Sequence, residues 1–203
     1  MSATDKRRKD PDKAADRRRQ VLEAAAACFG RSGFHGASMS EISKAAGMSA
    51  GHIYNYFDSK DAIIAAFVED NAARVFELLA GLGEQPDILQ AMLDDLPNSV
   101  RDNMARESWA LQFEISAEAT RNPAIAAVVA DADRRTRTHF RAILAAGRAQ
   151  HGLAADEAIL DGRSETIIAL FQGLHARALH NPDLDEASVL ASFRLAIRGL
   201  LFG

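Results

Sequence analysis

A short segment, SAGHIYNYFDSK at residues 49–60, gathers side chains that form hydrogen bonds with phosphates and base edges. His52 and Asn55 have the reach to contact base edges in a major groove, where a good bidentate contact gives roughly 1 to 3 kcal/mol of discrimination. Tyrosine hydroxyls and a lysine ammonium hold phosphate oxygens. The pattern predicts a DNA-reading surface made of this segment and two serines that precede it. Its residues are Ser38, Ser40, Ser49, Ala50, Gly51, His52, Tyr54, Asn55, Tyr56 and Lys60.

Capping signals place this segment on the second of two short helices. Ser38 followed three residues later by Glu41 has the spacing of a capping box, so the first helix is expected to begin near Met39. Gly47 permits a sharp turn with positive φ, and Ser49 caps a second helix predicted over residues 50–56. Two helices and a turn also occur as plain packing units. The agreement of five such signals favours a unit that reads DNA.

Residues 17–64, RRRQVLEAAAACFGRSGFHGASMSEISKAAGMSAGHIYNYFDSKDAII, resemble the amino-terminal domain of the tetracycline-repressor (TetR) family of bacterial transcription regulators. Serine replaces the usual threonine at Ser38. His52 stands where many relatives carry threonine, serine or asparagine, so base preference does not transfer at that position. The matching positions are Gly33 and Phe34 after the first helix, Ser38 and Ser40 at the start of the second, Ala46, Gly47, Met48 and Ser49 at the turn, and Tyr54, Tyr56, Phe57 and Lys60 at the end.

Charge divides the chain in the way that this resemblance implies. The formal net charge is −4, but residues 1–60 carry 11 Lys and Arg against 7 Asp and Glu, whereas residues 61–203 carry 13 against 21. A basic head gains affinity for DNA by releasing counterions while an acidic body stays away from the phosphates. We expect a flexible arm of mixed charge at residues 1–15, whose arginines either contact phosphates or only aid solubility. A helix-turn-helix domain follows at 16–60 and an effector and dimerisation domain at 61–203.

The larger domain is expected to be helical throughout, which makes the fold class all-α. Apolar residues recur at helical spacing, no strand pattern is present, and Asn122 before Pro123 is a strong helix start. Pro97 is expected to kink or break one helix. The predicted helices cover residues 59–79, 87–104, 106–119, 122–150, 155–179 and 185–202.

The last two predicted helices form a hairpin with more apolar surface than one chain easily covers. Repeating the hairpin across a two-fold axis gives a four-helix bundle, which the resemblance also implies. A homodimer would place two reading helices in major grooves about one helical turn apart, or somewhat more, so the operator is expected to be palindromic. A monomeric core hairpin is the alternative. The expected interface residues are Ile167, Phe171, Leu174, Phe193, Ile197 and Leu200.

Aromatic and polar residues of the middle helices suggest a chamber for a small-molecule effector. Ordinary core packing is the commoner explanation for any one of them. Glu114 would pair with a cationic ligand only if it faces inward. The segment LQFEISAEATRNP loosely resembles the effector domain of choline and betaine regulators, without identifying the effector. The candidate ligand-binding residues are Trp109, Phe113, Glu114, His139, Phe140, Phe171 and His175.

The sequence argues against most other functions. The common nucleophile, phosphate-loop, dinucleotide and metalloprotease motifs are missing, so we expect neither catalysis nor a cofactor nor a metal. The single cysteine, Cys28, fits a small buried residue. With no run of 18 apolar residues and no secretion signal, a cytoplasmic protein without membrane contact is expected.

These observations favour a ligand-responsive repressor released from its operator by a small molecule. An activator and a DNA-organising protein of the same fold without an effector are alternatives. A further alternative is a helical ligand-binding protein or enzyme that does not bind DNA.

Overall fold

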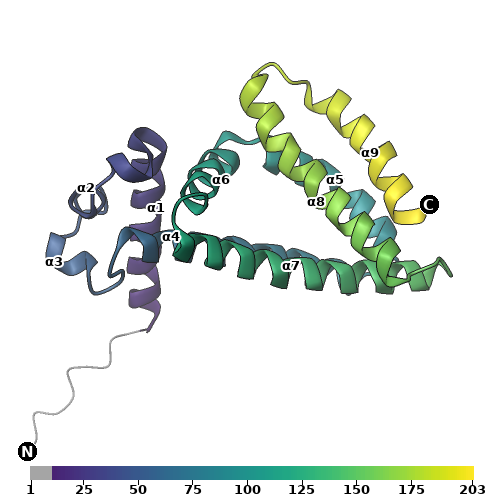
Figure 1. Ribbon diagram of the computed structural model, residues 1–203, viewed down its shortest axis with the longest axis horizontal. Helices are drawn as coiled ribbons and strands as arrows, with labels where there is room; N and C mark the ends of the chain where they lie inside the picture. The colour runs from purple at the N-terminus through teal and green to yellow at the C-terminus, as the bar shows by residue number, and fades with distance from the viewer. Residues whose placement is uncertain (1–10) are drawn as a thin grey trace, which may run out of the picture.

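The computed structural model describes residues 11–203, apart from the side chains of residues 11–12 and 106–109, and this part of the chain contains helices and no strand (Figure 1). The all-α prediction is confirmed. None of the described helices combines the length and apolar character needed to cross a bilayer. The helices are α1 (Pro11–Gly36), α2 (Met39–Ala45), α3 (Ala50–Ile53), α4 (Lys60–Gly83), α5 (Ile88–Met104), α6 (Arg106–Ala119), α7 (Pro123–Gln150), α8 (Glu157–His180) and α9 (Glu186–Phe202).

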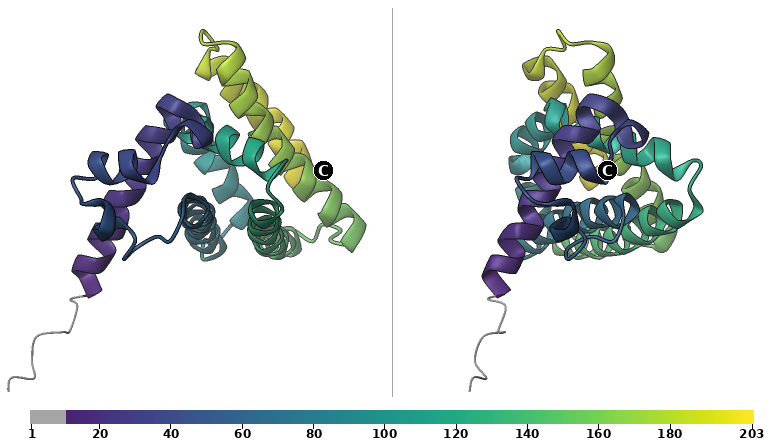
Figure 2. Two further views of the ribbon diagram at one scale, coloured as in Figure 1. Left: turned by 60° about the vertical axis from the view of Figure 1, so that its left-hand side comes forward. Right: turned by 90° about the vertical axis from the view of Figure 1, so that its left-hand side faces the viewer.

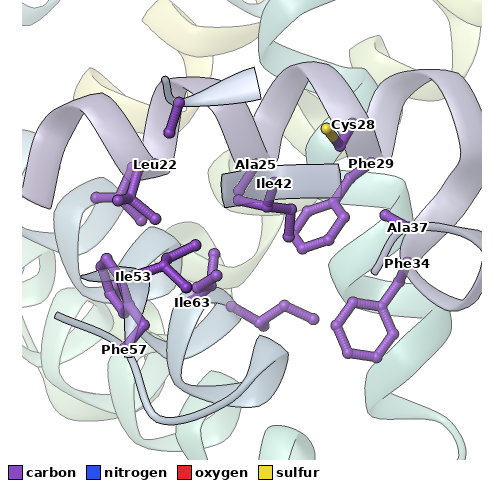
Figure 3. Packing of buried hydrophobic residues seen from close by; sticks show 14 of the residues in the cluster. Leu22, Ala25, Cys28, Phe29, Phe34, Ala37, Ile42, Ile53, Phe57 and Ile63 are labelled. Atoms are coloured by element: carbon purple, nitrogen blue, oxygen red, sulfur yellow. The ribbon is translucent and has the colours of Figure 1, made fainter. Parts of the chain in front are cut away.

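Helices α1 to α3 form a small head around an apolar core (Figure 3). Phe29, Ile42 and Ile53 are almost fully buried in it. Near the end of α1, Gly33 has a φ of 69°, which turns the chain toward α2. Helix α1 begins at Pro11, five residues before the expected domain start. Residues 1–10 of the expected arm lie outside the described part.

Two long helices, α4 and α7, connect the head with the rest of the molecule. They pack side by side and are seen end-on in Figure 2, left. The expected end of α4 at Leu79 is wrong, because the helix continues through Gly81 to Gly83. A glycine inside a helix costs about 1 kcal/mol but does not itself end it, and packing on α7 supports these turns.

Helices α5, α8 and α9 pack with α7 around a second apolar core. Pro97 does not break α5, which runs unbroken from Ile88 to Met104. Proline removes one backbone hydrogen bond, but Leu96 and Val100 beside it are buried, and this tertiary packing maintains the helix. Asn122 accepts hydrogen bonds from the first amides of α7, so the predicted start of that helix is confirmed.

Candidate functional site

The short helices of the head are capped as the sequence predicts. The Ser38 hydroxyl accepts a hydrogen bond from the Glu41 amide (3.1 Å), and the Glu41 carboxylate accepts one from the Ser38 amide (2.9 Å). The bond from this amide lowers the pKa of Glu41. Ser49 accepts from the His52 amide at 3.2 Å, and Gly47 between the two helices has a φ of 61°. These bonds set the direction in which α3 leaves the turn.

Helix α3 is shorter than predicted, because it ends at Ile53 instead of residue 56. The chain then tightens into turns, in which the amides of Asn55 and Tyr56 bond to carbonyls three residues back. Ile53 and Phe57 are buried and anchor both sides of the turn. The reading surface is therefore one helical turn followed by a tight loop.

Most of the predicted DNA-binding residues are exposed on this part of the head. The Tyr54 side chain is half exposed. Tyr56 is partly buried, and its hydroxyl lies 3.3 Å from Nε2 of His52, with the two rings 5.4 Å apart. This contact with Tyr56 orients the His52 ring. The exposed members are Ser38, Ser40, Ser49, Ala50, Gly51, His52, Tyr54 and Asn55.

Lys60 has an internal role that the sequence did not reveal. Its ammonium donates to the carbonyls of Phe34 and Ala37, both at 2.7 Å, and lies 4.6 Å from the centre of the Phe34 ring. Two of its three donors are thus used to attach the start of α4 to the end of α1. Beside the reading surface, the exposed Arg18 lies over the Phe57 ring at 4.3 Å. Arg18 belongs to α1, and this contact holds its guanidinium against Phe57, which follows α3.

Glu114 does not belong to the chamber, which corrects the sequence-based expectation. Its carboxylate accepts a hydrogen bond from the backbone amide of Phe34 at 2.9 Å. The turn at Gly33 leaves this amide outside the helical hydrogen-bond pattern, and Glu114 supplies the acceptor. The residue therefore attaches α6 to the head and is not among the residues that line the cavity.

A buried carboxylate, Glu118, completes this connection. It is 3% exposed and accepts hydrogen bonds from Arg121 (2.9 Å) and Asn122 (3.4 Å), while Nε2 of His35 lies 2.9 Å away. Burial alone would raise the pKa of Glu118, but these bonds and the nearby positive charges hold it below the usual value. Asn122 also donates to Asp61 at the start of α4 (3.0 Å). We call these contacts the domain joint: Glu114, Glu118, Arg121 and Asn122 against Phe34, His35 and Asp61.

A cavity of about 290 Å³ lies among α4, α5, α7, α8 and α9. Phe140, Phe171 and His175 line it, as predicted, and burial lowers the pKa of His175, which favours its neutral form. Among the described side chains, Phe113 and His139 are not part of the lining, and His139 packs against Phe76 instead. The side chain of Trp109 lies outside the described part. No sequence pattern indicates the polar lining residues, because they become neighbours only through packing: Asp95, Ser99, Asn103, Thr136 and Gln172.

Three of the six expected interface residues are core residues of the single chain. Ile167, Leu174 and Ile197 are only 3–5% exposed, because the apolar sides of α8 and α9 pack inward, α8 against α5 and α7 and α9 against α5. Phe171, Phe193 and Leu200 are partly buried, and the two phenylalanine rings are 5.5 Å apart. The outer face of the α8–α9 hairpin (Figure 1) is different in composition. It exposes Leu195 (77%) and small residues at helical spacing, namely Gly162, Thr166, Ala169 and Gly173 on α8 and Ser188, Ser192 and Gly199 on α9.

Known proteins share both halves of this architecture. Residues 21–67 match the family described as bacterial regulatory proteins, tetR family, and residues 86–201 match the BetI-type transcriptional repressor, C-terminal family. The transcriptional regulator UidR of Escherichia coli K12 is 29% identical over 184 residues, which cover 91% of this chain and 92% of UidR.

Two solved structures with bound small molecules share the fold. A transcriptional regulator from Saccharomonospora viridis in complex with choline is 23% identical, with a TM-score of 0.68 over 92% of this chain and 96% of that chain. FadR from Bacillus subtilis in complex with stearoyl-CoA is 16% identical, with a TM-score of 0.73 over 91% and 97%.

The relatives are regulators and not enzymes, and the matched segments together cover the head and most of the C-terminal domain. The resemblance predicted from residues 17–64 is confirmed. The chain belongs to the TetR family of bacterial transcription regulators.

Proposed function

We propose that this regulator is a homodimeric repressor that leaves a palindromic operator when a small molecule enters its cavity. One observation carries the proposal: a single helix, α4, is part of both sites. At its start, Lys60 is bonded to the head, and further along Val75, Leu79 and Leu82 line the cavity. A ligand that displaces this wall must move or strain the helix that holds the head.

The mechanism requires two arrangements of α4 with different affinities for DNA and ligand. A displacement of α4 passes to the head through Lys60, and the two heads then no longer match successive major grooves. A thousandfold loss of operator affinity needs about 4 kcal/mol of differential binding between the two states, which is accessible when two sites act together.

Several observations support the parts of this proposal. The matched C-terminal family is described as a repressor, and two structures of the same fold hold choline or stearoyl-CoA. The cavity favours a ligand-responsive protein over a DNA organiser with a filled middle domain. A protein that acts on chromosomal DNA works in the bacterial cytoplasm.

We propose the outer face of the α8–α9 hairpin as the dimer interface, in place of the inward-facing residues. Small residues allow two helices to approach closely, and Leu195 is too exposed for a monomer core. The variant Leu195→Asp should sediment as a monomer and lose operator binding, with Arg194→Ala on the same helix as the control. A wild-type protein that sediments as a monomer at micromolar concentration would contradict this interface.

The DNA-binding role is tested by selecting genomic fragments with the purified protein at low salt, then footprinting them. We expect a palindromic site and an affinity that falls steeply with salt. Tyr54→Phe should weaken binding to every sequence about equally, because it removes only a phosphate-binding hydroxyl. Asn55→Ala should relax base preference at one position in each half-site. Absence of salt-dependent duplex binding would contradict the proposed function.

A further inference from the structure

The described side chains that line the cavity and the groove beside it include carboxylates but no lysine or arginine. Among the described side chains that line the cavity, Asp95 is the only carboxylate, and no lysine or arginine is present. A shallower groove between α4 and α5 shares Leu78 and Leu82 with the cavity, and its ionisable lining residues are Glu77 and Asp94. Both the chamber and this neighbouring groove therefore carry negative charge, in a domain that has no lysine after residue 60.

From this lining we propose that the effector is a lipophilic organic cation, whose positive group pairs with Asp95 and whose apolar body fills the rest of the chamber. The inference rests on the proposed function for its biological role, but the binding chemistry stands on the cavity alone. A negative groove beside the cavity raises the local concentration of cations and speeds their association.

An anionic ligand would meet neutral donors but no lysine or arginine among the described side chains of this chamber, and it would lie near the Asp95 carboxylate. A buried carboxylate or phosphate needs a cation or several donors, and burial without them is costly. The arginines of α7 nearest in sequence to the lining residues Thr136 and Phe140 are already paired with carboxylates. Arg135 bonds to Glu69 at 2.7 Å and Arg137 to Glu165 at 2.6 Å, and Arg141 lies 3.0 Å from the Asp161 carboxylate.

Asp95 retains the capacity to accept a ligand. Its two oxygens accept hydrogen bonds from the Ser99 hydroxyl at 2.8 Å and from the Asn98 amide at 3.1 Å. An ionised carboxylate has about four acceptor sites, so both oxygens can still bond to an ammonium group. No lysine or arginine of the described side chains forms an ion pair with it. The Asp95 carboxylate is thus held in place by neighbours on its own helix and is not neutralised by them.

The remaining lining suits the body of such a ligand. Phe140 and Phe171 line the cavity with aromatic rings, a residue type that attracts cations, and Leu78, Leu82 and Ile168 line it with aliphatic side chains. His175 is shifted toward its neutral form by burial and adds no opposing positive charge. A small hydrophilic cation would leave most of this apolar surface unfilled.

The test uses four probes in isothermal titration calorimetry at pH 7 with the full chain. Three share one skeleton: 4-phenylbutylamine is a cation, 4-phenylbutan-1-ol is neutral and 4-phenylbutyrate is an anion. Choline is the fourth, a cation with little apolar body. We expect the amine to bind at least about tenfold more tightly than the alcohol, because a charge pair near 4 Å is strongly favourable at the dielectric of such a site. Choline should bind more weakly than the amine, and 4-phenylbutyrate should give no measurable heat.

Variants then locate the charge. Asp95→Asn keeps the shape and should reduce the affinity for the amine to that for the alcohol. Asp102→Asn, which removes the same charge from an exposed position on α5 outside the cavity lining, should leave the ratio unchanged. If Asp95→Asn fails to fold, the ranking of the three matched probes on the wild-type protein still decides the question.

Any of four results would overturn the inference. They are equal affinities for the amine and the alcohol, tighter binding of 4-phenylbutyrate than of the amine, binding of choline as tight as that of the amine, and no heat with the amine. If 4-phenylbutan-1-ol or 4-phenylbutyrate released the operator, the effector would not need to be a cation. That result would refute this inference and leave the proposed function intact. Failure to bind any operator would refute the proposed function, whereas the calorimetry, which contains no DNA, would still judge the cation site.

Discussion

The head and the C-terminal domain are stabilised by contacts of different range. In the head, the caps at Ser38 and Ser49 each involve a partner three residues away, and core residues such as Phe29 and Ile42 are almost fully buried. The C-terminal domain depends on partners far apart in sequence, such as Arg148 and Leu201, and it encloses a cavity. Short-range caps make a rigid reading unit, while a domain held by distant contacts around empty space can exist in two packings. The difference agrees with the proposed function, in which the head binds DNA and the C-terminal domain binds the effector.

The largest loss of stability is expected for Arg148→Ala, which removes long-range contacts of the C-terminal domain. The Arg148 side chain is buried, and its guanidinium donates to the carbonyls of Ala154 (2.6 Å), Leu201 (2.6 Å) and Gly203 (3.2 Å). Burial lowers its pKa, and the three acceptors offset the cost of burying its charge. Truncation leaves these carbonyls without a partner and opens a cavity. We expect a loss of about 3 kcal/mol in the free energy of unfolding, measured by urea denaturation.

The matched control for this change is Arg177→Ala, an exposed arginine in the last turn of α8. It should alter the free energy of unfolding by less than about 0.5 kcal/mol. A similar small loss for Arg148→Ala would show that the C-terminal domain does not depend on this long-range contact.

The second effect concerns the domain joint, where the two regions meet. Glu118→Gln should reduce the free energy of unfolding by about 2 kcal/mol at pH 7, because hydrogen bonds to a buried carboxylate are stronger than those to an amide. The folded-state pKa of Glu118 is lowered, so its contribution is complete above the usual value of 4.5 and is lost as the pH falls through the folded value. The difference between wild type and variant should therefore shrink in acid. Urea denaturation of both proteins at several pH values measures this difference in the free energy of unfolding. A difference that stays constant with pH would show that it does not come from the ionised Glu118 carboxylate.

These long-range contacts also mark the limit of what the sequence reveals. The caps at Ser38, Ser49 and Asn122 were predictable, because each partner lies two or three residues away. The role of Glu114 was not, since its partner Phe34 is 80 positions earlier. An apolar stripe identifies a buried face but not what covers it, which is why the stripe on α8 predicts an interface role for Ile167 whereas the structure places this residue in the core.

A smaller effect is expected for Gly47→Ala in the turn of the head. An added Cβ would meet nothing within 4 Å, so any cost comes from the backbone conformation alone. With a φ of 61°, alanine should destabilise the head by about 1 kcal/mol. Thermal unfolding monitored by a probe in the head measures the loss. No loss would show that the turn relaxes, and that the head is less rigid than its caps indicate.

The smallest effect on stability, and the clearest separation of folding from reading, is expected for Gly51→Ala. This exposed glycine lies in α3, and an added Cβ again meets nothing within 4 Å. Alanine should stabilise the short helix by about 0.5 kcal/mol, because it loses less backbone freedom on folding than glycine does. Operator affinity should nevertheless fall, since the methyl group keeps the backbone of α3 away from the duplex. Unfolding and fluorescence-anisotropy titrations on the same sample test both halves, and unchanged affinity would place the close approach to DNA elsewhere on the head.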